Sequence, residues 1–212
     1  MKPNHVKLFE NYLRELNLFQ EEEIQFISEK STFRKFKKSE YFVEKGNKCS
    51  DFIFVTKGIF RSFFGLKPTS VITFGFTFER NFLTSLSSYI TEEESEENIQ
   101  AIEDSEALVL SKSDLFQLES QYPGWNKFLK IYSEKQFFRM EKIIRRIYQE
   151  DAETRYMNLI QTQPHYFQRL PLSYIASYLG ITQRHRSRIR KGIMIKEKGV
   201  LTRGKAAIKI LD

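Results

Sequence analysis

Short stretches of strand-forming residues follow one another through residues 32–111, and this cadence constrains the fold more than any other feature of the sequence. The stretches recur about every eight to twelve residues, and Gly, Asn, Lys or Asp-Ser separates them. Short strands at such regular spacing are typical of an all-β sandwich or roll. We therefore expect a β-roll built from YFVEKG, DFIFVTKG, IFRSFFG, SVITFGF, NIQAIE and ALVLS.

A long helix is predicted after the β-rich region, because residues 125–149 contain neither Gly nor Pro. Pro123 and Gly124 break the chain before it. Two apolar stripes along this helix indicate two packing partners, namely the β-roll of the same chain and the same helix of a second copy; the alternative is a single buried core helix. The first stripe is Trp125, Leu129, Tyr132, Met140, Ile143 and Ile147, and the second is Phe128, Phe137, Ile144 and Tyr148.

Further helices flank these two elements, which makes the expected fold class α+β. Residues 6–30 have the apolar spacing of two short helices with Asn17 between them, and another helix begins near Ser113. Asp151 begins a helix that Pro164 closes. The predicted organisation is a β-roll domain with its helices at 1–122, the long helix at 123–150 and a C-terminal domain at 151–212.

Basic residues concentrate in the C-terminal quarter of the chain. Residues 164–212 hold 11 Lys and Arg against 2 acidic residues, whereas residues 1–163 hold 23 against 25. This quarter is therefore the part expected to meet a polyanion. Nucleic acid is favoured over a lipid surface, because the segment alternates helix and strand signals instead of forming one amphipathic helix.

The stretch SYIASYLGITQRHRSRIRK, residues 173–191, has the pattern of a helix-turn-helix. Ala176 is small where the second helix would cross the first, Gly180 tolerates the positive φ of a turn, and Thr182 can cap the second helix. At about 100° per residue, the polar and basic side chains of the second helix share one stripe opposite Ile189. Gln and Arg on such a stripe suit the base edges of a major groove. The stripe consists of Arg184, Ser187, Arg188 and Lys191, with Gln183 at its N-terminal edge.

A solvated helix face is the alternative interpretation of this stripe. Such a face usually mixes both signs of charge, and this helix has no acidic residue. Arg186 fits the pattern badly, since it projects toward the inner face beside Ile189. Its side chain either extends outward to a phosphate along its apolar stem or loosens the unit. The sequence therefore predicts DNA contact and leaves its strength open.

The order and spacing of these motifs resemble the Crp/Fnr family of bacterial transcription regulators over essentially the whole chain, in the form found in Bacteroidetes-type bacteria. YFVEKGNKCSDFIFVTKGIFRSFF resembles the front of the family's cyclic-nucleotide-binding-like β-roll, with Gly46 and Gly58 at turns. DAETRYMNLI resembles the first helix after the interdomain hinge, LPLSYIASYLGIT…RIRK the helix-turn-helix, and VLTRGKAAIKIL the wing. The resemblance implies a double-stranded β-roll, a long dimerisation helix and a C-terminal winged helix-turn-helix domain.

The resemblance also implies roles for individual residues in a homodimer that binds a near-palindromic site in double-stranded DNA. Arg186 departs from the family, whose members usually carry a hydrophobic residue there. Basic residues of the wing would add phosphate contacts. The positions that match base contacts are Gln183, Arg184 and Arg188, those that match backbone contacts are Ser187 and Lys191, and Thr182, Arg203 and Lys205 complete the expected DNA-binding set.

No cofactor is expected, and cyclic AMP binding is not expected either. Members of the family that respond to cyclic AMP carry a Gly-Glu pair and an Arg-Ser or Arg-Thr pair late in the β-roll; here Ser95 and Glu96 stand about where the second pair would lie. Five Glu in residues 92–97 would repel a phosphate and fit a solvated loop. A different small-molecule effector stays open, although Phe-rich strands more commonly form a packed core. Its candidate pocket residues are Phe74, Phe76, Arg80 and Met140.

Catalysis and membrane insertion are not expected. The three His fall in different predicted elements, and no phosphate loop, nucleophile elbow or metal-ligand spacing occurs. No apolar run approaches the roughly 20 residues of a membrane span, no secretory signal is evident, and Cys49 is the single Cys, which favours the cytoplasm. The expected function is sequence-specific transcription regulation. The alternatives are a regulator gated by another ligand in the β-roll and a β-roll interaction module with a degraded DNA-binding domain.

Overall fold

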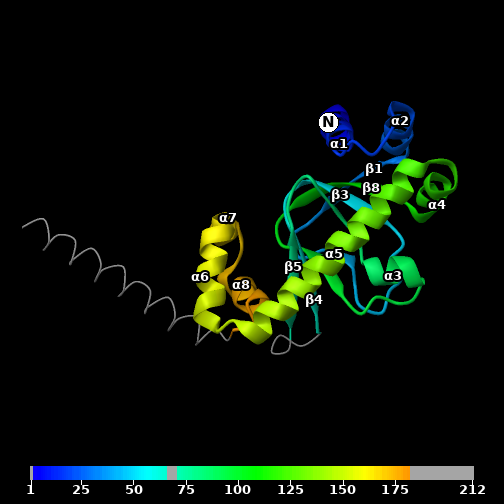
Figure 1. Ribbon diagram of the computed structural model, residues 1–212. Helices are drawn as coiled ribbons and strands as arrows, with labels where there is room; N and C mark the ends of the chain where they lie inside the picture. The colour runs from blue at the N-terminus through cyan, green and yellow to red at the C-terminus, as the bar shows by residue number, and fades with distance from the viewer. Residues whose placement is uncertain (1, 66–70, 182–212) are drawn as a thin grey trace, which may run out of the picture. The chain divides into compact units, whose positions relative to one another are not determined.

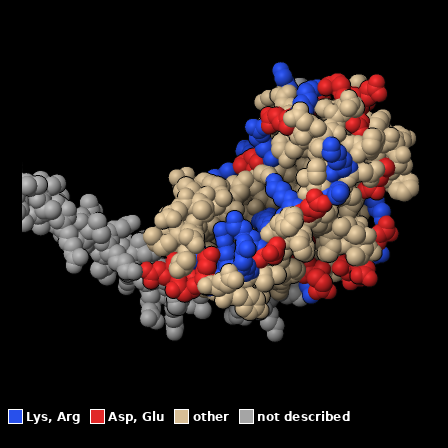
Figure 2. Space-filling model, viewed as in Figure 1, with Lys and Arg blue, Asp and Glu red and all other residues tan. Residues whose placement is uncertain are grey.

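The computed structural model describes residues 2–65 and 71–181, in two compact units, Met1–Ile143 and Ile144–Asp212 (Figure 1). The long helix α5 (Pro123–Gln149) begins in the first unit and ends in the second. On the face drawn in Figure 2, basic and acidic side chains are interspersed over the described residues. Within those residues, no helix combines the length and the apolar character that crossing a membrane requires.

Two short helices open the first unit, as the apolar spacing predicted. They are α1 (Lys2–Glu15) and α2 (Glu21–Lys30), and Asn17 between them adopts a φ of 53°. The first turn of α2 is acidic, which complements the positive end of the helix dipole. One of its acidic residues, Glu23, also accepts a hydrogen bond from the Gln20 backbone N–H at 2.7 Å and so caps the helix.

The predicted β-roll is confirmed: the described residues from Thr32 to Leu110 form two antiparallel four-stranded sheets, with strand orders β1-β8-β3-β6 and β2-β7-β4-β5. Three short elements of this region were not among the predicted stretches, the strands β1 and β6 and the helix α3 (Leu86–Thr91), because none of them is long enough to show a clear period. The strands are β1 (Thr32–Phe36), β2 (Tyr41–Val43), β3 (Phe52–Lys57), β4 (Phe60–Phe64), β5 (Ile72–Thr77), β6 (Asn81–Leu83), β7 (Asn98–Ala101) and β8 (Ser105–Leu110).

Strand β3 separates two hydrophobic cores by its alternation. Phe52 and Phe54 belong to the core shared with α1, α2, α4 and α5, whereas Ile53 and Val55 belong to the core between the two sheets. Phe52, Phe54 and Phe60 are at most 1% exposed, so these aromatic side chains are packed core rather than the wall of an apolar pocket. The turn that follows β3 needs Gly58, because its φ is +90° and a Cβ there would lie 2.8 Å from the Ser105 Cα.

Helices α4 (Lys112–Gln121) and α5 complete the first unit, and Tyr122 separates them. Trp125 and Phe128 of α5 are buried, and the Phe128 ring lies 4.7 Å from the Phe82 ring. Phe128 is therefore buried like Trp125 of the first predicted stripe, whereas the other members of its own predicted stripe, Phe137, Ile144 and Tyr148, are exposed. The exposed apolar residues of this helix are Ile131, Phe137, Phe138, Ile144, Ile147 and Tyr148.

The second unit contains the end of α5 and three shorter helices, α6 (Ala152–Thr162), α7 (Pro164–Arg169) and α8 (Leu172–Tyr178). Asp151 caps α6, as predicted, by accepting a hydrogen bond from the Thr154 backbone N–H at 2.8 Å. Pro164 ends α6 and also begins α7, because proline is tolerated at the first position of a helix. The buried side chains of these helices are Tyr156, Leu159, Leu170, Ile175, Ala176 and Leu179.

Candidate functional site

Helix α8 ends in a turn of the kind that a helix-turn-helix requires. The Ile181 N–H donates to the Ala176 carbonyl at 3.0 Å, and the Gly180 N–H donates to the Ser177 carbonyl at 3.1 Å. This pair of bonds is a Schellman motif, and it needs the left-handed φ of +65° that Gly180 adopts. The predicted turn glycine is therefore at a turn, and the chain leaves it directly into its most basic part.

The residues that were expected to contact DNA lie outside the described residues, and so do Arg186 and the predicted wing. They are Thr182, Gln183, Arg184, Ser187, Arg188, Lys191, Arg203 and Lys205. Their roles remain predictions, and the described geometry that leads up to them is that of helices α6 to α8 and the turn that ends α8.

A second candidate site lies where the β-roll meets α5. It consists of Ser85, Ser95 and Glu97 from the roll and Tyr132 and Arg139 from α5, and we call it the inner polar cluster. The hydroxyl oxygens of Ser85 and Ser95 are 2.9 Å apart, and both residues are at most 1% exposed. The Ser95 hydroxyl also donates to the Glu97 backbone carbonyl at 2.9 Å, and the Ser85 hydroxyl acts on the Glu97 carboxyl by lowering its pKa. The cluster therefore links polar groups of the roll to a charged residue of the long helix.

The electrostatics of the inner polar cluster are set by burial. Burial raises the pKa of the Glu97 carboxyl to about 7, although the Ser85 hydroxyl and the Arg139 charge both act to lower it. Burial also raises the pKa of the Tyr132 phenol, against the charge of Arg139. Glu97 thus titrates near neutral pH, close to a permanent positive charge on α5.

The guanidinium of Arg139 fits against β5 because Gly75 has no side chain. A Cβ at Gly75 would lie 2.7 Å from Nη2 of Arg139, which is too close for any real contact. Ser62 of β4 is the cross-strand partner of Gly75, so these two residues share the face of the sheet that meets Arg139. Sequence reasoning missed this contact, and a glycine inside a strand was the available signal for a close approach.

The four residues predicted for a ligand pocket are placed as follows. Phe76 follows Gly75 in β5, so its side chain leaves the sheet on the face opposite Arg139. Phe74 stacks on Phe64 with ring centroids 4.6 Å apart. Met140 is partly buried on α5. A pocket formed by these residues stays a prediction.

Arg80 stands apart from the other three. Its side chain is exposed, and its guanidinium pairs with the carboxylate of Glu15 on α1 at 2.5 Å. A different arginine, Arg61, is buried in the sheet, where its Nε donates to the Thr73 hydroxyl at 2.9 Å. The sequence pattern gave no reason to prefer Arg61, because its strand reads as an ordinary apolar run.

The acidic run 92–97 is only partly the solvated loop that was predicted. Glu92 pairs with Lys112 at 2.8 Å and Glu96 pairs with Lys45 at 2.5 Å, and all four side chains are well exposed. Ser95 is 1% exposed, however, and Glu97 lies in the inner polar cluster. The two residues that the sequence resemblance would place at a phosphate-binding pair are thus a buried serine, Ser95, and an outward-facing carboxylate, Glu96.

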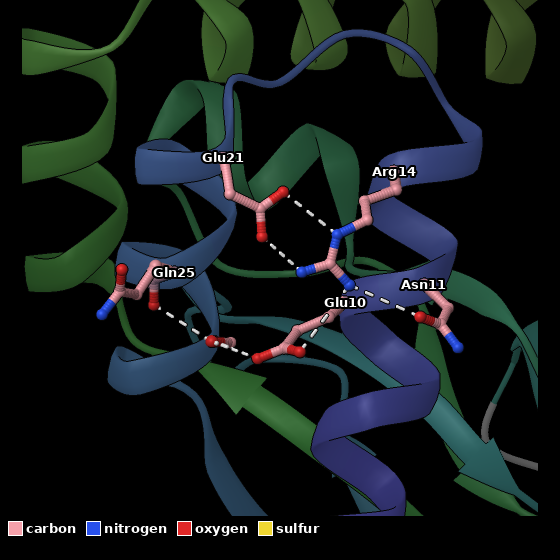
Figure 3. Close-up of polar contacts among 6 residues, drawn as sticks. Glu10, Asn11, Arg14, Glu21 and Gln25 are labelled. Atoms are coloured by element: carbon pink, nitrogen blue, oxygen red, sulfur yellow. Dashed lines mark hydrogen bonds and ion pairs between the residues drawn. The ribbon is translucent and has the colours of Figure 1, made fainter.

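An opening of about 550 Å³ lies between α1 and α2. Its polar groups bond to one another across the two helices, as Figure 3 shows for Arg14 and Glu21. The Ser28 hydroxyl donates to the Glu10 carboxylate at 3.0 Å, and Arg14 donates to the Asn11 side chain at 3.4 Å. The bonds of Arg14 to Glu21 and of Ser28 to Glu10 join α1 to α2, whereas the bond of Arg14 to Asn11 lies within α1.

Comparison with known proteins supports the fold of the first unit and the order of the elements. Residues 33–122 match the cyclic nucleotide-binding domain family. No curated protein matches the chain significantly.

Solved structures of transcription regulators have a similar fold. The c-di-GMP-responsive global regulator CLP of Xanthomonas campestris is 14% identical, with a TM-score of 0.69, and the match covers 84% of this chain and 93% of that chain. A protein assigned to the Crp/Fnr family of transcriptional regulators from Eubacterium rectale is 15% identical, with a TM-score of 0.68 over 88% of each chain. FixK2 of Bradyrhizobium japonicum is 15% identical, with a TM-score of 0.66 over 79% of this chain and 86% of that chain.

Proposed function

We propose that this chain is a sequence-specific DNA-binding transcription regulator of the Crp/Fnr type. The observation that carries the proposal is the turn at Gly180, which ends a packed helix in a Schellman motif immediately before the most basic segment of the chain. The fold similarity to Crp/Fnr regulators supports it. In such a unit the second helix enters the major groove, and its stripe led by Gln183, Arg184 and Arg188 contacts the bases.

The regulator acts as a homodimer that pairs two copies of α5. Exposed apolar side chains along the helix support this part of the proposal. Phe137, Ile144 and Tyr148 are 68%, 52% and 85% exposed, and large apolar side chains exposed together on one helix are typical of an interaction surface. Two-fold symmetry would place two recognition helices about 34 Å apart, on successive turns of a near-palindromic site.

The β-roll of this regulator does not take cyclic AMP. At the place that matches the family's phosphate-binding pair, Ser95 is buried and bonded to Ser85, and Glu96 pairs with Lys45. The carboxyl of Glu97 lies beside them, and in its ionised form it would repel a cyclic phosphodiester.

A regulator gated by a different small molecule is the second candidate. The inner polar cluster favours it, because it brings a permanent cation of α5 next to polar groups of the roll. Thermal-shift screening of metabolites separates the two candidates: a stabilising compound whose effect is lost in Arg139→Gln supports gating, and no stabilising compound supports a regulator without an effector.

Selection of bound fragments from a random DNA pool, with purified protein and no added ligand, tests the proposed function directly. We expect a two-fold symmetric motif at low salt and weaker recovery at high salt, because phosphate contacts release counterions. Arg184→Ala should relax one position in each half-site, at a cost of about tenfold in affinity for the selected site. Arg34→Ala, which removes an exposed arginine from β1, is the matched control and should leave the motif unchanged.

Other outcomes point to the alternatives. Salt-sensitive binding without a motif indicates either a missing effector or a recognition helix disturbed by Arg186. Binding that appears only in Arg186→Leu shows that the natural protein has a degraded DNA-binding domain. No binding at either salt concentration contradicts the proposal and favours the alternative in which the protein acts as a β-roll interaction module.

A further inference from the structure

One arginine of the second unit holds the ends of two helices. Arg155 lies near the start of α6. Its Nε donates at 2.8 Å to the backbone carbonyl of Leu179, the residue that caps the C-terminal end of α8. Its Nη1 donates to the carbonyl of Glu150, which directly follows α5. A single guanidinium therefore connects the end of the long helix to the residue before the Gly180 turn.

The chemistry of the two partners explains why an arginine stands there. The last carbonyls of a helix have no partner within the helix, and the C-terminal end carries the negative pole of the helix dipole. In α8, the Schellman bonds satisfy the carbonyls of Ala176 and Ser177 but leave that of Leu179 for another donor. A planar fork with several N–H groups and a permanent charge can serve both helix ends at once, whereas a lysine ammonium is a single point.

Neighbouring bonds fix Arg155 from the other side. Asp151 caps α6 through the Thr154 N–H, and the Arg155 N–H donates to the Asp151 carbonyl at 3.1 Å. The Asn158 side chain donates to the Glu150 carboxylate at 3.1 Å. The start of α6 is thus fastened to the residue after α5, so the distance from that residue to the Gly180 turn depends on Arg155.

We propose that Arg155 is a positioning residue that sets the place of the Gly180 turn, and with it the start of the basic segment, relative to the end of α5. The inference rests on the proposed DNA-binding function. In a dimer joined through α5, the separation of the two recognition helices depends on this link. Arg155 then determines which half-site spacing the protein accepts, without touching the DNA itself.

The test compares wild type, Arg155→Met and Arg155→Lys on a set of operators whose half-sites are moved apart or together by one and two base pairs. We expect wild type to prefer one spacing by about tenfold or more, because both recognition helices must face the groove. Arg155→Met should lose about tenfold in affinity for that operator and prefer it by less than about threefold. Arg155→Lys should fall between the two. Arg145→Met, which removes an exposed arginine from the same unit, is the matched control and should keep the wild-type preference.

Hydrogen exchange of the full chain gives a readout that needs no DNA. Protection of the Gly180 and Ile181 amides should fall in Arg155→Met, while that of β3 and β8 in the first unit stays unchanged. A variant that merely unfolds the second unit would lose protection throughout α6 and α8 and would bind no operator; that outcome overturns a positioning role.

The measurements distinguish a failure of the proposed function from a failure of the positioning role of Arg155. If wild type shows no preference for spaced half-sites, the proposed function fails and takes this inference with it. If wild type shows the preference and Arg155→Met keeps it, the proposed function stands and the positioning role is wrong. Unchanged protection of Gly180 and Ile181 in Arg155→Met also overturns it.

Discussion

The two ends of α5 are held by the same device with opposite charges. At the N-terminal end, the Gly124 N–H donates to the Glu23 carboxylate at 2.9 Å, and the same carboxylate caps α2 through Gln20. At the C-terminal end, Arg155 donates to Glu150 and to α8. Each charge complements the pole of the helix dipole that it meets, and each links α5 to a second helix.

The difference between the two ends is burial. Glu23 is 4% exposed, whereas Arg155 is only partly buried. The N-terminal end is also tighter, because a Cβ at Gly124 would lie 2.7 Å from both carboxylate oxygens of Glu23. Charged hydrogen bonds contribute more to stability where water cannot replace them. Helix α5 is therefore anchored firmly to α2 at its N-terminal end and more loosely at the end that leads toward the basic segment.

The largest predicted effect comes from breaking the buried end. Glu23→Ala should lower the free energy of unfolding of the first unit by about 3 kcal/mol, because two backbone N–H groups lose a charged acceptor inside the protein. Urea unfolding followed by the fluorescence of Trp125, the single and fully buried Trp next to Gly124, measures the change.

The neighbouring residue provides the control for this measurement. Glu22 lies in the same helical turn but is exposed, so Glu22→Ala should cost less than about 0.5 kcal/mol. Equal losses in the two variants would mean that the charge of the first turn, and not the buried bonds of Glu23, stabilises the helix ends.

Local signals were sufficient to predict most of the elements that these ends connect. The break at Pro123, the cap at Asp151 and the turn glycines Gly58 and Gly180 are each set by backbone chemistry within a few residues. The roles of Glu23 and Arg155 could not be predicted in this way. Glu23 bonds to a residue 101 positions away in the chain, and Arg155 bonds to one 24 positions away. Nothing in the local sequence distinguishes a charged helix residue with such a distant partner from one that is solvated.

A second, smaller effect is predicted between the two ends of α5, at the inner polar cluster. The unfolded chain has the ordinary pKa of 4.5 for Glu97, and the folded protein has a pKa of about 7. Between pH 4.5 and pH 7, the unfolded state has released the Glu97 proton while the folded state still holds it. The free energy of unfolding therefore falls as the pH rises through this range, and above pH 7 Glu97 causes no further fall. The loss amounts to roughly 2 kcal/mol for this partly buried group.

Unfolding measured from pH 5 to pH 8 in wild type and in Glu97→Gln tests this prediction. The variant, which is neutral at every pH, should remove the decline, whereas Glu96→Gln, at the exposed neighbour paired with Lys45, should keep it. A decline that persists in Glu97→Gln would assign the titration to another group. If the decline disappears in Glu97→Gln, ionisation of Glu97 weakens the inner polar cluster at neutral pH. The middle of α5 then contributes less to stability there than the end held by Glu23.

The candidate site itself was less accessible to sequence reasoning than the fold. The acidic run suggested a solvated loop because charge patterning describes side chains one by one, and it could not show that Glu97 turns inward while Glu96 turns outward. In the same way, Arg80 was the arginine included among the candidate pocket residues, yet its partner is Glu15 on α1. Burial of a single charge follows from the register of the sheets and the packing of α5, which no local pattern encodes.

The smallest predicted effect concerns the loosely held end, at the turn that Arg155 supports. Among the described residues, a Cβ at Gly180 would meet no atom within 4 Å, so within this part of the chain it is the left-handed φ of +65° that opposes Gly180→Ala. We expect a loss of about 1 kcal/mol in the stability of the second unit, without a change in the first. Hydrogen exchange of the Ile181 amide against that of β3 measures both. A loss several times larger would mean that the turn is as tightly packed as the Gly124 end, and the contrast between the two ends of α5 would then not hold.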